Sequence, residues 1–222
     1  TRVTYHWTFD TDKEEQTKDG EAFVRNDLAD GEHTVKVYAT DEADNVSTTT
    51  NSWTWTVDTH APTNLVVVGE PADGSVTSNR VFRFEVSSED LTDVRYSWKL
   101  SDGQTSDKQE FSGKVTGEDG TYSVSVIATD MAGNESSTNW TWTLDTIAPT
   151  NLTLRGLPIA DDPKKVIVTN GYFFAFTASA GDATAITYHW TLKRDGAVVS
   201  SGQDAIFSGS EIVDGAYVAS VY

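Results

Sequence analysis

The sequence repeats itself after roughly 90 residues, and this repeat limits the chain to a series of similar domains. A Tyr-x-Trp motif begins at Tyr5, Tyr96 and Tyr188. Trp-Thr-Trp-Thr occupies 53–56 and 140–143, and each copy leads, after one aliphatic residue, into Asp-Thr-x-Ala-Pro-Thr-Asn-Leu. A unit of this length suits one two-sheet β-sandwich, so the repeat predicts sandwiches in tandem.

The copies of the repeat also place the domain boundaries. We predict domains at 1–57, 58–144 and 145–222, with linkers at 58–62 and 145–149. The first domain begins at its Tyr-x-Trp segment, and the third ends before a Trp-Thr-Trp segment appears. We therefore expect the first to be incomplete on its N-terminal side and the third on its C-terminal side. Because the sequence does not begin with Met, we also expect it to be part of a longer chain.

Alternation of polar and apolar residues is the dominant local pattern, and it predicts β-strands. Turn residues such as Asp-Gly separate these segments, and no stretch shows the 3.6-residue period of a helix. We predict an all-β fold of about seven antiparallel strands per domain, with Trp98 in the core of the middle domain. Its strands are expected at Asn64–Val68, Val81–Val86, Val94–Leu100, near Gln104, near Phe111, Thr121–Ala128 and Asn139–Leu144.

Charge and composition exclude several classes of function. The chain carries 34 acidic and 16 basic side chains, a formal net charge of −18, so its surface repels nucleic acid and anionic lipid. The lack of cysteine excludes a disulfide framework and a thiolate metal site. No apolar run reaches the roughly 18 residues that a membrane helix needs. No hydrolase or nucleotide-binding motif occurs, so we expect no enzymatic activity.

One segment carries a family likeness. Tyr-Ser-Val-Ser-Val-Ile-Ala-Thr-Asp-Met-Ala-Gly-Asn, from Tyr122 to Asn134, with the later Asp-Thr-x-Ala-Pro-Thr, resembles the bacterial Ig-like repeats of giant surface adhesins. The segment is similar to repeats of the giant non-fimbrial adhesins of enteric bacteria, which are exported by type I secretion and tied to virulence. The resemblance implies tandem Ig-like β-sandwiches in a linear stalk, a secreted protein at the bacterial cell surface, and calcium bound between domains.

Acidic residues gather where two such domains would meet. In a sandwich of this topology, the turn before Thr121–Ala128 lies at the end nearest the following domain. The loop before Val94–Leu100 and the loop after Thr121–Ala128 lie at the end nearest the preceding one. The first junction is predicted to collect Asp30, Asp58, Asp130 and Asn134, with Asp90 and Asp93 in a nearby loop. The second is predicted to collect Asp119, Asp145 and Asp182.

Clustered carboxylates repel one another, and a hard divalent cation would reverse that repulsion. Ca²⁺ accepts six to eight oxygen ligands in flexible geometry, whereas Mg²⁺ demands a tighter octahedron and Zn²⁺ prefers His or Cys. We therefore predict Ca²⁺ as the cofactor. A plainer interpretation also stands, because Asp before Gly is a common turn residue. It applies to Asp30, Asp119 and Asp214, and less to Asp58 and Asp145, which precede no Gly.

The function predicted is that of a structural stalk segment, which interdomain calcium stiffens so that a distal adhesive domain is held away from the cell. Its partners would be the neighbouring Ig-like domains of the same chain, with host-cell glycans bound only through the distal domain, and we expect a monomer. Two alternatives remain: a lectin-like glycan-binding module, suggested by seven tryptophans, and an accessory Ig-like module of a secreted enzyme.

Overall fold

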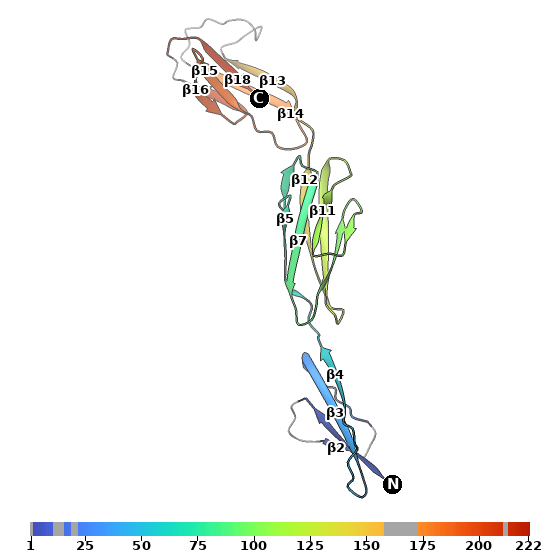
Figure 1. Ribbon diagram of the computed structural model, residues 1–222. Coiled ribbons are helices and arrows are strands. Elements are labelled where there is room, and N and C mark those ends of the chain that lie inside the picture. Colours follow the sequence, from blue (N-terminus) through green and yellow to red (C-terminus); the bar gives the residue numbers. More distant parts are fainter. Residues whose placement is uncertain (1, 11–15, 19–21, 158–172, 211–212) are drawn as a thin grey trace. The chain divides into compact units, whose positions relative to one another are not determined.

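The computed structural model describes residues 2–10, 16–18, 22–157, 173–210 and 213–222, and all regular elements in these ranges are β-strands (Figure 1). The part of the chain that the structure describes holds no helix with the length and apolarity that a membrane crossing needs. The chain divides into two compact units, which are described separately. The first comprises Thr1–Ser75, Val81–Gly117 and Thr121–Trp142, and the second comprises Val76–Arg80, Glu118–Gly120 and Thr143–Tyr222.

The first unit opens with a single four-stranded sheet of order β2-β1-β3-β4. Its strands are antiparallel, and their bounds are β1 Val3–Phe9, β2 Gln16–Lys18, β3 Gly31–Asp41 and β4 Asn51–Val57. Phe9 and His33 are buried on one face of this sheet. The Trp-Thr-Trp segment lies on β4, where Trp53 is 73% exposed and Trp55 is half-buried.

Two sheets form the middle sandwich (Figure 1). The smaller has the order β10-β7-β5, and the larger the order β6-β12-β11-β8-β9. The strands are β5 Thr63–Glu70, β6 Ser75–Thr77, β7 Val81–Glu89, β8 Arg95–Leu100, β9 Thr105–Ser106, β10 Glu110–Lys114, β11 Gly120–Thr129 and β12 Glu135–Leu144.

The alternation seen in the sequence becomes the core of this sandwich. On β7, Phe82, Phe84 and Val86 are buried while the residues between them face outward. Trp98 is 1% exposed, which confirms it as a core residue, and its indole Nε1 donates to the carbonyl of Lys108 at 2.8 Å. Phe84 packs edge-on or tilted against the rings of β12, including Trp142 at 5.5 Å between centroids. The period-two pattern therefore predicted correctly which residues of these strands face the core.

One strand was not predicted. β6 joins the edge of the larger sheet beside β12, although the preceding strand β5 belongs to the smaller sheet. Gly74 N donates to the carbonyl of Thr141, and Asp145 N donates to that of Thr77, so the two segments run in the same direction. β6 has only three residues, and its Val76 is exposed, so the alternation of polar and apolar residues is too short to reveal the strand.

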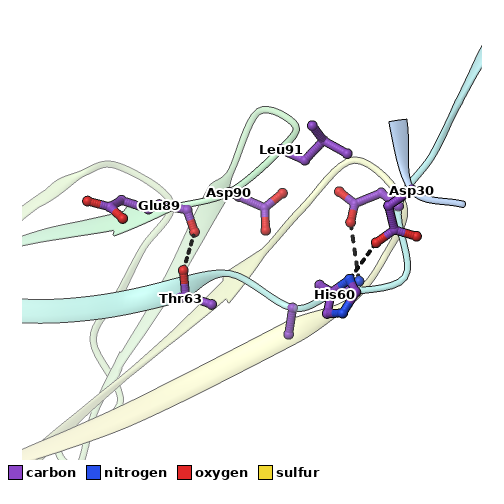
Figure 2. Close-up of a pocket in the computed structure, with 8 residues that line it drawn as sticks. Asp30, His60, Thr63, Glu89, Asp90 and Leu91 are labelled. Carbon is purple, nitrogen blue, oxygen red and sulfur yellow. Dashed lines mark hydrogen bonds and ion pairs between the residues drawn. The ribbon is translucent and has the colours of Figure 1, made fainter. Parts of the chain in front are cut away.

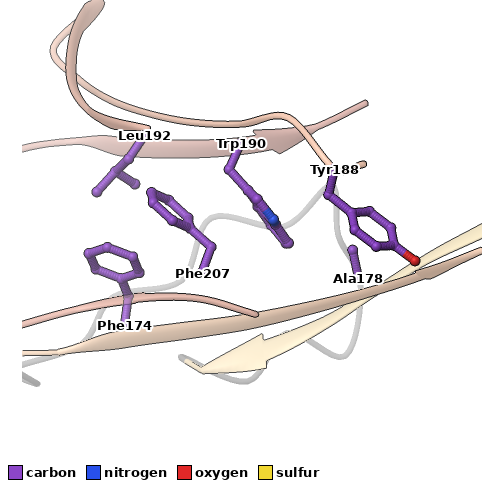
Figure 3. Close-up of a cluster of buried hydrophobic side chains, with 6 residues drawn as sticks. All are labelled: Phe174, Ala178, Tyr188, Trp190, Leu192 and Phe207. Carbon is purple, nitrogen blue, oxygen red and sulfur yellow. The ribbon is translucent and has the colours of Figure 1, made fainter. Parts of the chain in front are cut away.

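The second unit contains sheets of order β13-β14-β17 and β16-β15-β18. Their strands are β13 Thr150–Leu157, β14 Phe174–Gly181, β15 Trp190–Arg194, β16 Ala197–Gly202, β17 Ile206–Gly209 and β18 Tyr217–Val221. Figure 3 shows the core between them, where Trp190 lies over Phe207 with 5.5 Å between ring centroids. The Trp190 indole donates to the carbonyl of Asp204 at 2.8 Å, repeating the contact that Trp98 makes.

Candidate metal centre

Three carboxylates converge at the start of the middle sandwich. Asp58 comes from the linker after β4, Asp90 from the loop after β7, and Asp130 from the loop after β11. One oxygen of each lies within 4.8 Å of the other two. Asp130 is completely buried and the other two are partly buried. Among the described residues, no Lys or Arg forms an ion pair with any of the three, so the cluster holds concentrated negative charge.

Asp130 is fixed by the loop that carries it. Its Oδ1 accepts the backbone N–H groups of Gly133 at 2.6 Å and Asn134 at 2.8 Å, and its Oδ2 accepts the Asn134 amide at 2.8 Å. Burial raises the pKa of this carboxyl, but the hydrogen bonds from Asn134 and Gly133 outweigh burial and leave the pKa lowered. Asp130 therefore stays ionised in spite of its burial.

Asn134 connects this loop to the linker. Its side-chain nitrogen lies 3.2 Å from the carbonyl of Asp58 and 3.3 Å from that of His60, as well as near Asp130 Oδ2. The amide therefore donates within the loop and toward the linker backbone. Asn134 was predicted as a metal ligand, and the structure places it as the residue that holds the linker against Asp130.

Thr92 stands between the other two carboxylates. Its backbone N–H donates to Asp90 Oδ1 at 2.9 Å, and its hydroxyl lies 3.1 Å from both Asp58 Oδ2 and Asp90 Oδ1. A hydroxyl has a single hydrogen to donate, so one of the two carboxylates always faces an oxygen without a proton between them. Two unit charges about 5 Å apart repel by roughly 3 kcal/mol at an effective dielectric of 20, and one hydrogen bond offsets only part of this.

We expect Thr92→Val to destabilise the protein in EDTA by about 1 kcal/mol, because it removes the one donor shared by Asp58 and Asp90. Thr92→Ser keeps the hydroxyl and should retain most of the stability. Chemical denaturation of the two variants measures the difference. Equal stability of the Val and Ser variants would show that the hydroxyl does not hold these carboxylates.

Asp30 lies along the same pocket but has different partners, as Figure 2 shows. Its carboxylate accepts the Thr59 hydroxyl at 2.9 Å and the Thr59 N–H at 3.2 Å, and it pairs with the His60 ring. The bond from His60, followed by those from Thr59, lowers the pKa of Asp30, and the same pair raises the pKa of His60. Asp30 thus anchors the linker to the turn before β3.

The second linker repeats these contacts within the second unit. Asp119 accepts the Thr146 hydroxyl at 2.9 Å and also pairs with Arg80 at 3.1 Å. The Thr184 hydroxyl donates to Asp145 Oδ2 at 2.6 Å and lies 3.2 Å from Asp182 Oδ1. The Thr184 N–H is the main cause of the lowered pKa of Asp182. Thr184 therefore bridges Asp145 and Asp182, while Asp119 accepts from the linker threonine.

The remaining predicted residue lies apart. Asp93 is exposed and is not among the clustered carboxylates. Glu89, the last residue of β7, accepts the Asn64 amide at 2.8 Å. Of the predicted first-junction set, the structure thus brings together Asp58, Asp90 and Asp130.

Sequence reasoning missed the threonines. Thr59 and Thr146 follow Asp58 and Asp145 in both linkers, and Asp-x-Thr occurs at both 90–92 and 182–184. Each of these threonines donates its hydroxyl to a junction carboxylate. The repeated Asp-Thr and Asp-x-Thr pairs were the signal that could have revealed them.

Comparison with known proteins finds a family match within the middle sandwich. Residues 66–144 match the family model of the PKD domain. No curated protein matches the chain. The match, together with the strands of the structure, confirms the all-β, Ig-like sandwich predicted for the middle domain from the repeat.

Several solved structures are similar to this chain. The PKD1 domain of the Vibrio cholerae metalloprotease PrtV is 24% identical, over 39% of this chain and 100% of that one, with a TM-score of 0.33. A tetra-tandem repeat from the extending region of a large adhesion protein is 20% identical, over 99% and 62%, with a TM-score of 0.34. Part of a 1.5-MDa bacterial ice-binding adhesin is 17% identical, over 98% and 84%, with a TM-score of 0.36.

Proposed function

We propose that this chain is a structural segment of a bacterial cell-surface adhesin, in which calcium stiffens the linkers between Ig-like domains so that a distal domain is held away from the cell. The observation that carries the proposal is the convergence of Asp58, Asp90 and Asp130 within 4.8 Å, from a linker and two loops. The protein would act outside the cell, as a monomer and without catalysis, and its partners would be its neighbouring domains.

The donor set fits calcium. All three side chains offer carboxylate oxygens, which Ca²⁺ binds in flexible geometry. Backbone carbonyls of Asp58 and His60 point toward the adjoining Asn134 amide and add oxygens to this end of the sandwich. The cluster itself contains no His, which disfavours Zn²⁺. A bound calcium ion would supply the positive charge that three neighbouring carboxylates lack.

The chain's own residues make the joint responsive to that charge. Asp58 is part of the linker, whereas Asp90 and Asp130 belong to the sandwich that follows. While the carboxylates repel one another, hydrogen bonds from Asn134 and Thr92 hold the linker to this end of the sandwich. Relief of the repulsion would let all three carboxylates hold the linker and the two loops together. Scarce calcium inside the cell would leave the joint pliant, and abundant calcium outside would stiffen it.

Thermal unfolding of the full chain in millimolar Ca²⁺ and in EDTA tests this proposal. At a free concentration of 100 times Kd, a single site adds about 2.7 kcal/mol to the free energy of unfolding. We expect an upward shift in Ca²⁺ that Asp58→Asn and Asp90→Asn each reduce strongly. Asp93→Asn is the matched control, since it removes the same charge from the same loop but lies outside the cluster.

Two results would contradict the proposal. An equal shift with Mg²⁺ would indicate general screening of the acidic surface, because a rigid octahedral ion does not favour such a site. An Asp93→Asn variant that loses as much of the shift as Asp58→Asn would show that overall charge, and not the three-carboxylate cluster, responds to calcium. Binding measured by calorimetry on the same variants separates affinity from stability.

The glycan-binding alternative is supported by one exposed tryptophan among the residues that the structure describes. Trp53 is 73% exposed, while Trp98, Trp142 and Trp190 are buried in cores. The repeat partner of Trp53 is Trp140, whose indole donates to the carbonyl of Pro71 at 2.8 Å and packs near Phe84. The position is thus used for packing where the sandwich has both sheets, which favours the structural role.

A further inference from the structure

A corner at the start of β3 differs chemically from its copy in the second unit. In the second unit, the hydroxyl of Tyr217 donates at 2.7 Å to the carbonyl of Val213, four residues earlier, and so pins the turn that leads into β18. In the first sheet, His33 takes this place: its Nε2 lies 2.8 Å from the carbonyl of Ala29, also four residues earlier. The same turn is held, but by a group that changes its charge near neutral pH, unlike a tyrosine hydroxyl.

The residue that pairs with His33 also differs from its counterpart in the middle sandwich. Its Nδ1 lies 2.7 Å from Asp10 Oδ2, and Asp10 Oδ1 accepts the N–H of Thr34 at 2.7 Å. In the middle sandwich, Ser101 stands at the position of Asp10, and its hydroxyl accepts the N–H of Ser123. Tyr122 stands there at the position of His33. The first sheet thus replaces a neutral Tyr and Ser with a His and Asp pair.

The two acceptors define the state of the ring. A carboxylate and a carbonyl both accept hydrogen bonds, so His33 satisfies both only when each ring nitrogen carries a hydrogen. The side chain is almost fully buried, which makes an unsatisfied contact costly. After loss of the proton, a nitrogen lone pair faces either the Asp10 carboxylate or the Ala29 carbonyl.

Other groups around the ring are aromatic or already paired. Phe9 stacks on it at 5.4 Å between centroids, and Trp55 lies at 5.8 Å. The positive charge of Arg25 disfavours protonation of His33, but Arg25 pairs with Asp27 at 3.1 Å and lies over the Phe9 ring. The Asp10 carboxylate and the Ala29 carbonyl dipole therefore dominate the electrostatic environment of His33.

We propose that His33 and Asp10 make the turn before β3 a pH-sensitive clamp, closed while the imidazole is protonated and released when it loses its proton. The turn matters because Ala29 precedes Asp30, whose carboxylate holds Thr59 of the linker. The clamp would therefore control how firmly the linker is attached to the first sheet. It does not involve calcium, and it would stand if the metal site were disproved.

The sign of the effect follows from the two pKa shifts. The bond to Ala29, followed by that to Asp10, raises the pKa of His33 above its ordinary 6.5. Its stabilisation is complete below 6.5 and disappears as the pH rises through the raised value. For Asp10, burial raises the pKa, but the bonds from His33 and Thr34 lower it below 3.8 overall. The clamp is thus closed at pH values between the lowered pKa of Asp10 and the raised pKa of His33, and it opens as the pH rises above the latter.

The first test is an NMR titration of the histidine rings in the full chain, in EDTA so that metal does not contribute. His33 is assigned by its absence from the His33→Tyr variant. We expect it to titrate above 6.5. A value at or below 6.5 would overturn the proposal.

The second test follows the turn itself by hydrogen exchange of residues 31–37, normalised to the equivalent residues 120–126 of the middle sandwich. We expect relative protection to fall as the pH rises through the titration of His33. The double variant His33→Tyr with Asp10→Ser, which transplants the corner of the middle sandwich, should show constant relative protection. A decline that persists in this variant would overturn the proposal.

A control separates the neighbouring histidine. His60 pairs with Asp30 and also titrates near the turn. His60→Ile introduces the residue that the second linker has at Ile147. The decline in protection should persist in this variant. If it disappears, His60 and not His33 is responsible, and the clamp as described is wrong.

Discussion

Trp98→Ala is expected to lower the free energy of unfolding of the middle sandwich by about 3–5 kcal/mol, the range for removal of a large aromatic side chain from a core. Trp98 is 1% exposed and packs near Phe84 and Phe111. The substitution also leaves the Lys108 carbonyl without its indole donor. Both losses act on the centre of the sandwich, so the effect should be among the largest of any single substitution.

Native-state hydrogen exchange of the β11 amides measures this loss without relying on tryptophan fluorescence. Trp53→Ala is the matched control, because it removes the same side chain from a position that is 73% exposed. It should change stability by less than about 0.5 kcal/mol, as surface substitutions do. Comparable losses from the two variants would mean that Trp98 does not lie at the centre of the core.

Asp130→Ala in EDTA is expected to lower the unfolding midpoint of the middle sandwich by roughly 5–15 °C. The carboxylate accepts three hydrogen bonds from Gly133 and Asn134, and the substitution removes all three from a completely buried position. The pKa of Asp130 is lowered from 3.8, so its stabilisation is fully present above pH 3.8. It is lost as the pH falls through the lowered value, and the variant should unfold with less dependence on acid.

Calorimetry of the variant between pH 2 and pH 7 tests both statements. Asp41→Ala is the companion substitution, since Asp41 also accepts three hydrogen bonds, from Ala43 and Asn45 in the first sheet, but is only half-buried. We expect a smaller effect there. A larger loss of stability from Asp41→Ala than from Asp130→Ala would mean that burial of the carboxylate does not determine how much this turn stabilises the fold.

The sequence predicted the strands well because alternation and repetition agree. Phe82, Phe84 and Trp98 are buried at the positions that a period of two assigns to the inner faces. The strand β6 escaped because only three residues form it, and its partner on β12 lies far along the chain. Patterns of local sequence do not record which sheet a short segment joins.

The sequence indicated which loops bring acidic residues together, but not which of these residues form the cluster and which accept hydrogen bonds elsewhere. Asp58 and Asp90 meet because their loops end on the same side of the sandwich, which topology alone indicates. Asp30 was grouped with them, yet its carboxylate is taken by Thr59 and His60. The choice among several acidic residues depends on neighbouring hydroxyl and amide donors, and composition does not rank these.

The pairing of β6 with β12 has a mechanical consequence. One segment lies near the beginning of the middle sandwich and the other at its end, and backbone bonds from Gly74 and Asp145 join them while they run in the same direction. A pull applied at the two ends of the sandwich drags these strands past each other, so the bonds are loaded together in shear and do not open one after another like a zipper. Under tension, this small patch of parallel pairing would decide the force at which the whole sandwich gives way.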